Sequence, residues 1–429
     1  MSDKELYLKE LNEQGRTLFS CDKYEEAVKK YKQAIEEDPM YLPSYFNICE
    51  SYIMLDKYDE AKKVMKKVIL ADKNNGEAYF NLGNIALLEN DYEEGNVQYA
   101  KAINCGYDIS QIYINLASVA EDNDDWEKAI SYYTKAIARD RSCYSARIRK
   151  IQIYMMLNKY SDALNSADDL IEINPEIFEG HHFKFIILAT TDKLEEASDV
   201  LDKAQRLFPD DQGFVLDRIK LLELQEKYIE AMDLLESIKG EHIPKAVIYI
   251  EKANIYIKLK EIEKAKKLLE EYDGEDTVPE MKNLLIMIYI EEKNYAGILK
   301  CANKLIELEE YDSNYFSALY YKAFALKMLG EEKKAEQAYT EALRIMQQAC
   351  SVNSGVLDLY IYRAICYREL KLYDKANDML DYVETVEENI AETHYVRYLI
   401  YSDLEDERAE NELSKAKLLN SDIAGIFGE

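Results

Sequence analysis

The chain has few of the residues that interrupt helices, with only 6 Pro and 14 Gly among 429 residues. A protein rich in strands or loops needs many more turn residues, so this scarcity favours long helices with short connections. The sequence also lacks any run of about 18 apolar residues, which a membrane-spanning helix would need. Its first residues, Met1 to Glu13, are polar and charged, and they lack the apolar core of a signal peptide.

Basic residues are also in deficit. Lys and Arg number 54 against 83 Asp and Glu, and the resulting net charge of −29 repels phosphate groups. We therefore expect no nucleic acid and no membrane among the partners. The seven Cys are scattered and never spaced as CxxC, which is typical of free thiols in a reducing compartment. The sequence predicts a soluble cytoplasmic protein that is a monomer or a weak homo-oligomer.

Motifs that carry chemistry are missing as well. The chain has no GxxxxGK[ST], GxGxxG or GxSxG sequence. Of its four His, His181 and His182 are adjacent and must point to different faces of a helix, and no Cys or further His lies at ligand spacing. We therefore expect no enzyme, no catalytic residue, no cofactor and no metal site.

One period of 34 residues organises the chain. In a frame that starts at Leu8, the twentieth place holds a small residue in eight consecutive repeats: Ala27, Ala61, Gly95, Ala129, Ala163, Ala197, Ala231 and Ala265. The seventeenth place is mainly aromatic: Tyr24, Tyr58, Tyr92, Trp126, Tyr160 and Tyr228. Because 429 residues exceed what a single core supports, growth by repetition explains the length of the chain.

Each repeat contains two predicted helices. In the third repeat, Tyr79, Leu82, Gly83 and Ala86 share one helix face, and the apolar pattern restarts at Tyr92 after a polar turn. A helix pair buries too little apolar surface to fold alone, so it must pack against its neighbours. The small residue at the twentieth place lets the two helices of a pair approach closely where they cross.

These residues resemble the tetratricopeptide repeat (TPR). The repeat pattern of that family is a large residue, then Leu-Gly, Tyr, Ala, an aromatic residue, Ala and Pro. Parts of this pattern occur as Tyr79, Leu82 and Gly83, as Tyr24, Ala27, Tyr31, Ala34 and Pro39, and as Tyr113, Leu116, Trp126, Ala129, Tyr133 and Ala136. Three repeats depart from it, with Ile151, Phe185 and Ile219 where the family has Gly or Ala. The resemblance implies an all-α fold, a right-handed α-solenoid superhelix of about twelve helix-turn-helix repeats.

The spacing divides the chain into two parts. Repeats 1 to 7, within residues 5–245, keep a constant interval, whereas repeats 8 to 12, within 246–424, start near 246, 279, 316, 357 and 391 and precede a tail at 425–429. The step from 316 to 357 exceeds 34 by seven residues, about two helical turns, and predicts longer helices there. The stretches 272–276 and 351–355 are the least helical, and we expect limited proteolysis to cut near them.

The resemblance also implies a binding surface, because TPR proteins line a concave groove with the first helix of each repeat. Its second, fifth, sixth and ninth places give the candidate peptide-binding groove: Phe46, Asn47, Phe80, Asn81, Asn84, Ile114, Asn115, Ile148, Arg149, Gln152 and His182, followed by Tyr320, Tyr321 and Phe324. The apolar members can be a binding ladder or can only pack between neighbouring first helices, and the sequence leaves both interpretations open.

Two finer predictions concern charge. Asn84, Asn115 and Arg149 match three places of the carboxylate clamp of chaperone-binding TPR domains, but Phe80 and Ser145 stand where the clamp has lysines, so no such clamp is expected. Arg149 also belongs to a basic cluster, Arg139, Arg141, Arg147, Arg149 and Lys150. This cluster either balances acidic neighbours such as Glu121 and Asp122, which we favour, or anchors an acidic group of a partner.

The predicted function is that of a scaffold, or adaptor, that holds a protein or an extended peptide in the concave groove. The alternative is a peptide-responsive regulator whose superhelix changes shape when a ligand binds. Such regulators usually carry an additional amino-terminal domain, and the first repeat of this chain begins almost at Met1. The scaffold is therefore the preferred hypothesis, although fold alone does not assign function.

Overall fold

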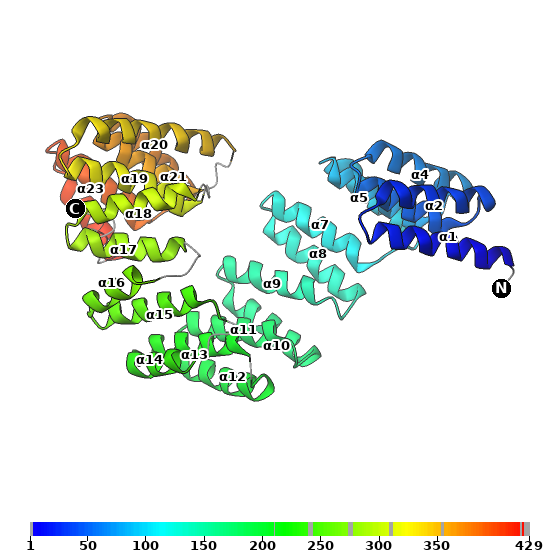
Figure 1. The fold of residues 1–429 in the computed structure, drawn as a ribbon, viewed down its shortest axis with the longest axis horizontal. Coiled ribbons are helices and arrows are strands. Elements are labelled where there is room, and N and C mark those ends of the chain that lie inside the picture. Colours follow the sequence, from blue (N-terminus) through cyan, green and yellow to red (C-terminus); the bar gives the residue numbers. More distant parts are fainter. Residues whose placement is uncertain are drawn as a thin grey trace. The chain divides into compact units, whose positions relative to one another are not determined.

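The computed structural model describes residues 3–209, 211–238, 243–272, 278–308, 312–352, 356–420 and 423, and within these ranges the regular elements are all α-helices (Figure 1). The first seven pairs are α1 (Asp3–Phe19), α2 (Tyr24–Glu37), α3 (Leu42–Ile53), α4 (Tyr58–Ala71), α5 (Gly76–Leu88), α6 (Tyr92–Asn104), α7 (Ser110–Asp122), α8 (Trp126–Arg139), α9 (Tyr144–Met156), α10 (Tyr160–Ile173), α11 (Phe178–Thr190), α12 (Leu194–Leu207), α13 (Gln212–Leu224) and α14 (Tyr228–Ser237).

The pairing continues through α15 (Lys245–Lys258), α16 (Ile262–Glu270), α17 (Pro279–Glu291), α18 (Tyr295–Glu307), α19 (Ser313–Met328), α20 (Glu332–Val352), α21 (Leu357–Glu369), α22 (Tyr373–Val386), α23 (Ala391–Asp403) and α24 (Ala409–Leu419). Among the described residues this gives 24 helices, or twelve pairs, as the repeat count predicted. None of these helices has the length and apolarity that a membrane span requires.

The helix pair of the fourth repeat shows how the sequence forms each unit of the stack. Tyr113, Leu116 and Ala117 form the buried face of α7, and Ala129 of α8 is 0% exposed where the two helices meet. The side chain of Asp125 caps α8 by accepting a hydrogen bond from the backbone N–H of Lys128, at 3.2 Å. The cap satisfies a donor that would otherwise have no partner at the helix start.

A left-handed residue recurs at the turn inside each pair. Non-glycine residues with φ between 54° and 61° stand at the same place of successive repeats: Asp22, Asp56, Asn90, Asp124, Asn158, Asp192, Glu226 and Lys260, and again at Lys293, Lys371 and Glu405. Only in the tenth pair is this turn made by a glycine, Gly330. The chain therefore makes most of these turns without glycine, which explains how so many turns coexist with so few glycines.

The helices form two compact units, Met1–Leu221 and Leu222–Glu429, and the boundary falls within α13. The predicted division at 245/246 marks the change of repeat interval and remains a prediction. In the second unit, α19 is buried around most of its surface, and α20 has 21 residues whereas α18 has 13. The predicted tail, 425–429, lies outside the described residues.

Within each unit, several odd-numbered helices pack against one another on the same side of the helix pairs. Neighbouring first helices pack against one another, as in α1 with α3, α3 with α5, and α9 with α11, and in the second unit from α15 through α23. No comparably close pair of even-numbered helices occurs in the described part of the chain. The first helices of successive repeats therefore share one face, and the second helices lie outside it.

Candidate peptide-binding groove

The apolar members of the candidate groove lie on successive first helices of the first unit. Phe46, Phe80, Ile114 and Ile148, on α3, α5, α7 and α9, are all half-buried, and each packs at the edge of a core cluster. The Phe80 ring lies 5.9 Å from that of Tyr99 and 5.6 Å from that of Tyr107. These side chains thus contribute to packing and still expose part of their surface. A role in binding and a role in packing between first helices are therefore compatible.

Amide side chains link first helices across two repeat boundaries. Asn47 donates to Oδ1 of Asn12 at 3.0 Å, which joins α3 to α1. Asn115 donates to Oδ1 of Asn84 at 2.9 Å, which joins α7 to α5, and the Tyr99 hydroxyl donates to the same oxygen at 2.7 Å. Asn81 instead donates to the backbone carbonyl of Glu77 in its own helix, at 2.8 Å.

The Tyr99 hydroxyl holds this second pair in place. It also accepts a hydrogen bond from Asn115 at 2.9 Å, and burial raises the pKa of Tyr99 to about 12, so the phenol stays protonated at neutral pH. Oδ1 of Asn84 thus accepts two hydrogen bonds, while the amide N–H groups of Asn84 have no partner among the described residues. These donors are available to a carbonyl oxygen of a bound peptide.

Arg149 is paired within the chain. Its guanidinium forms an ion pair with the Glu121 carboxylate of α7 and donates to Oε1 of Gln152 at 2.9 Å, and the hydrogen bond with Glu121 raises the pKa of Arg149. Elsewhere in the basic cluster, Arg139 pairs with Asp108 at 2.7 Å. This pairing favours local charge balance over a free anchor for an acidic partner.

Two hollows lie along this surface. One, of about 430 Å³, is lined by Asn12, Arg16, Leu42, Pro43, Phe46, Asn47, Asn75 and Glu77, and the other, of about 320 Å³, by Ile114, Ser118, Glu121, Asp122, Tyr133, Ser145 and Arg149. The sequence did not single out Arg16 or Glu77, although Arg16 stands one helical turn after Asn12. Burial raises the pKa of Glu77.

His182 makes a third contact between first helices. Its Nδ1 lies 2.8 Å from Oδ2 of Asp217 on α13, and its ring stacks on Phe178 at 5.2 Å. Burial raises the pKa of Asp217. The sequence analysis did not list Asp217, although it occupies the same sixth place as Asn47 and Asn115. His181 faces a different partner, the carbonyl oxygen of Pro175 at 2.9 Å, and the described residues contain no cluster suited to a metal ion.

The three candidates of the second unit do not line an open surface. Tyr320, Tyr321 and Phe324 are 1%, 7% and 5% exposed, because α18, α20 and α21 cover α19. The Tyr320 ring lies 6.0 Å from those of Phe324 and Tyr362. Ile423, near the carboxyl end, belongs to the same core cluster. These residues are part of the core, and they are left out of the groove considered below.

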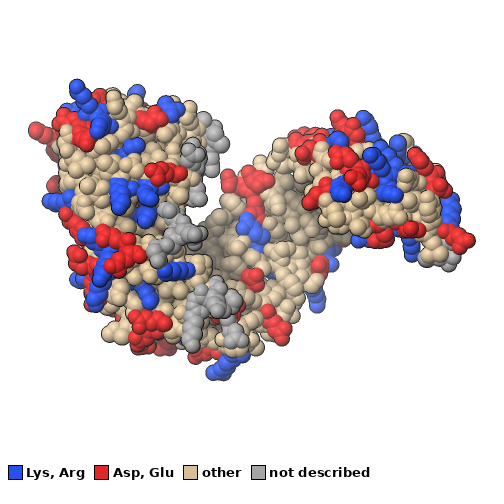
Figure 2. Space-filling model, viewed as in Figure 1, with Lys and Arg blue, Asp and Glu red and all other residues tan. Residues whose placement is uncertain are grey.

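Charged side chains of both signs are interspersed over the face seen in Figure 2. On this face the acidic excess does not gather into one large patch. Exposed charges mixed in this way keep a protein in solution and contribute little to a specific site.

Antiparallel helix pairs that stack through their first helices define the class of α-helical repeat proteins. Models described as tetratricopeptide repeat match residues 18–88, 114–176 and 246–274. The chain is a tetratricopeptide-repeat protein. No curated protein matches the sequence.

Two solved structures are similar to this chain, and the first of them supports the same fold. The yeast Tom70 structure is 16% identical, with a TM-score of 0.52 over 97% of this chain and 100% of that one. A tetratricopeptide repeat protein from Parabacteroides merdae ATCC 43184 is 19% identical, with a TM-score of 0.39 over 65% of this chain and 98% of that one. At 16% identity the similarity to Tom70 concerns the fold and leaves the partner open.

Proposed function

We propose that this protein is a binding scaffold that holds an extended peptide segment of a partner protein along the first helices of its first unit. The observation that carries the proposal is a row of apolar side chains at the same place on successive first helices. Phe46, Phe80, Ile114 and Ile148 recur at one place of successive repeats and stay half-exposed. A row of partly exposed apolar side chains on a regular spacing is typical of a binding surface.

The polar groups of this face support an extended backbone as the ligand. Asn12 with Asn47 and Asn84 with Asn115 form hydrogen-bonded pairs beside the apolar row, so these amides are held in position before a ligand arrives. Preorganised donors and acceptors lose little entropy on binding. The repeat spacing then lets apolar side chains of the peptide contact Phe80 and Ile114 while its backbone meets the amides.

The pairing of Arg149 with Glu121 defines the charge preference of this face. An acidic group on the peptide would have to displace Glu121 from Arg149, so we expect ligands of this groove to need no acidic residue. The groove should therefore select for apolar side chains and an extended backbone.

A peptide library displayed on phage tests the proposal with the full chain as bait. Peptides enriched by the natural protein should bind a Phe80→Ser, Ile114→Ser double variant about tenfold more weakly, because each lost contact removes on the order of 1 kcal/mol. The control is Leu70→Ser on α4, since Leu70 is 80% exposed and lies on a second helix. Equal affinity of both variants would refute the groove, and a collapse of the melting midpoint of the double variant would show that these residues only pack.

A further inference from the structure

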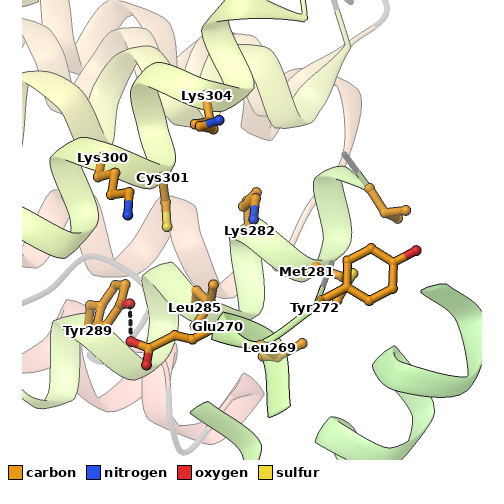
Figure 3. A pocket seen from close by; sticks show the side chains of 11 residues that line it. Leu269, Glu270, Tyr272, Met281, Lys282, Leu285, Tyr289, Lys300, Cys301 and Lys304 are labelled. Carbon is orange, nitrogen blue, oxygen red and sulfur yellow. Dashed lines mark hydrogen bonds between the residues drawn. The ribbon is translucent and has the colours of Figure 1, made fainter. Parts of the chain in front are cut away.

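A separate hollow of about 520 Å³ lies in the second unit between α16, α17 and α18 (Figure 3). Its lining residues are Leu269, Glu270, Tyr272, Val278, Met281, Lys282, Leu285, Tyr289, Lys300, Cys301 and Lys304. The hollow is larger than either of the two on the candidate groove. It has an apolar floor that includes Met281 and Leu285, and lysines stand around it.

The hollow lies beside the end of a short helix, α16. This helix has 9 residues, whereas α2, α4, α8, α10 and α12 have 14. It ends at Glu270, and Leu269 and Glu270 from its end line the hollow. The difference of five residues is more than one helical turn.

Three lysine amines line this space. Lys282 of α17 and Lys300 and Lys304 of α18 have no ion pair or hydrogen bond within the described part of the chain, whereas nearby Lys266 pairs with Glu292 at 2.7 Å. In Figure 3 all three lysines stand around the same opening. The charges of Lys282 and Lys300 also act on the Cys301 thiol, where they oppose the burial that raises its pKa. Lys282 is half-buried, and Lys300 is exposed at the edge of the hollow.

One acidic residue shares the hollow. Glu270 accepts a hydrogen bond from the Tyr289 hydroxyl at 2.6 Å. In Figure 3 this pair is seen at the bottom of the view and Lys304 at the top. The lining therefore carries three positive charges and one negative charge, in a chain whose net charge is −29. Within the described lining, positive charges therefore exceed negative charges by two.

We propose that this hollow binds an acidic segment of a partner protein, with carboxylates on Lys282, Lys300 and Lys304 and a neighbouring large apolar side chain on Met281 and Leu285. A volume of about 520 Å³ accommodates more than one side chain. A long polyanion such as nucleic acid would extend beyond the hollow over a chain whose net charge is −29 and be repelled, whereas a short acidic peptide fits within the lysines.

This site is independent of the groove in the first unit. On α17 the places that correspond to the groove are Glu280, Asn283, Leu284 and Met287, and none of these lines the hollow. The residues that do line it, such as Lys282 and Leu285, lie on a different face of the helix. The proposed peptide binding in the groove and the proposed binding in this hollow can therefore be refuted independently of each other.

The test uses the full chain and a short fluorescent peptide in which Glu residues flank a central Leu-Phe pair, with Gln replacing Glu in a control peptide. Fluorescence anisotropy should show tighter binding of the acidic peptide and weakening as salt is added. The Lys282→Glu, Lys300→Glu, Lys304→Glu triple variant should lose about tenfold or more in affinity, since opposed charges are replaced by like charges. The corresponding triple Lys→Arg variant should retain binding.

A matched control separates this site from net charge. Lys63, Lys66 and Lys67 on α4 are exposed, and the structure records no partner for any of them. Changing all three to Glu alters the net charge equally and should leave affinity unchanged. Equal losses in both triple variants, or no loss at Lys282, Lys300 and Lys304 when circular dichroism shows native helix content, would overturn the proposal.

Two further results would also overturn it. Tighter binding at the same lysines by a phosphoserine version of the peptide would reassign the site to phosphopeptides. Binding that appears only after Asp273, Glu275 and Asp276 are changed to Asn, Gln and Asn would assign the three lysines to an acidic segment of this chain. Phe80→Ser, Ile114→Ser should not change this affinity.

Discussion

At the scale of single residues, the small side chain at the crossing of each helix pair controls packing. Ala27, Ala61, Ala129, Ala163, Ala197, Ala231 and Ala265 are all 0% exposed. Gly83 shows how little room remains elsewhere in a pair, since an added Cβ would lie 2.6 Å from carbon atoms of the Tyr99 ring. A regular series of small residues therefore marks positions where the backbone of one helix meets its neighbour.

Enlarging these positions should destabilise the protein. We expect Ala129→Leu and Ala163→Leu each to lower the free energy of unfolding by about 1–3 kcal/mol, because the added methylenes have no space. Ala138→Leu is the matched control, since Ala138 lies on α8 but is exposed. Urea unfolding followed by circular dichroism measures the change. A midpoint that does not move in either core variant would place the helix crossing elsewhere.

A buried carboxylate near the carboxyl end provides a pH dependence. Oε2 of Glu412 lies 2.7 Å from Nδ1 of His394, and Oε1 lies 2.7 Å from the Lys415 amine. Burial acts to raise the pKa of Glu412, but the hydrogen bonds from Lys415 and His394 and their charges outweigh it, so the pKa lies below its ordinary value of 4.5. Its ionised form is therefore stabilised in the folded protein.

A carboxyl group whose pKa is lowered by folding contributes its full stabilisation of the folded protein above its unfolded pKa, which is near 4.5. This contribution is lost as the pH falls through the lower pKa of the folded state. Acidification below about pH 4.5 should thus weaken the pair α23 and α24. Glu412→Gln should make stability less sensitive to pH in this range, as measured by urea unfolding at pH 7 and pH 4. An equal loss of stability in the natural protein and the variant would show that other carboxylates dominate.

At the scale of the elements, the turn between paired helices is the feature that repeats most faithfully. A left-handed conformation costs a non-glycine residue about 1–2 kcal/mol, and Lys260 adopts it with φ 59°. Lys260→Gly should stabilise the protein by up to about 1 kcal/mol, because glycine avoids this cost but loses more entropy on folding. Lys66→Gly within α4 should instead destabilise it by about 1 kcal/mol.

Thermal unfolding of the two glycine variants distinguishes these effects. Opposite shifts of the melting midpoint are expected from the same chemical change, since only the backbone conformation differs between the two positions. A lower midpoint for Lys260→Gly would indicate that the aliphatic part of Lys260 contributes packing that offsets its backbone strain.

Helix length is the other property of the elements that matters for function. The short α16 ends beside a hollow, whereas α20, with 21 residues, packs against α19. The same repeat frame thus produces an accessible site in one place and a buried core in another. The seven-residue excess in the sequence indicated a longer helix, but it did not show which neighbouring residues would become buried.

At the scale of the whole molecule, the two parts of the chain should bind different ligands. Fragment 1–245 ends after α14 and fragment 246–429 begins within the first turn of α15, so each cut leaves nearly every helix intact. We expect the first fragment to keep peptides selected by the groove and the second to keep the acidic peptide, because the two sites share no residue. Circular dichroism should first establish that each fragment folds. Identical binding by both folded fragments would contradict this division.

Limited proteolysis is expected to cut first near 272–279 and 350–356, as the interrupted pattern predicts. Most of these positions lie outside the described residues, and the prediction therefore rests on sequence. Mass spectrometry of the first products identifies the positions of the first cuts. Cleavage distributed evenly over all turns between helices would indicate a uniform array.

The sequence by itself determined the helix pairs and the repeat frame. Ala129, Tyr133 and Leu116 become buried within one pair or its neighbour, and such contacts join residues close in the chain, so their period is visible in the sequence. The candidate groove on the first unit was also placed by this frame, but the hydrogen bonds of Asn47 to Asn12 and of Asn115 to Asn84 were not predicted. When the same local packing repeats in each unit, the sequence shows a periodic pattern.

Only the tertiary structure decided which of the indicated surfaces stay accessible. Tyr320 occupies a groove place in the frame yet is 1% exposed, because three other helices surround α19. Arg149 pairs with Glu121, and the lysines at 282, 300 and 304 line one hollow beside the end of α16. Exposure and charge pairing depend on what each neighbouring helix covers, and that is set by helix length and stacking, which the spacing of small and aromatic residues does not record.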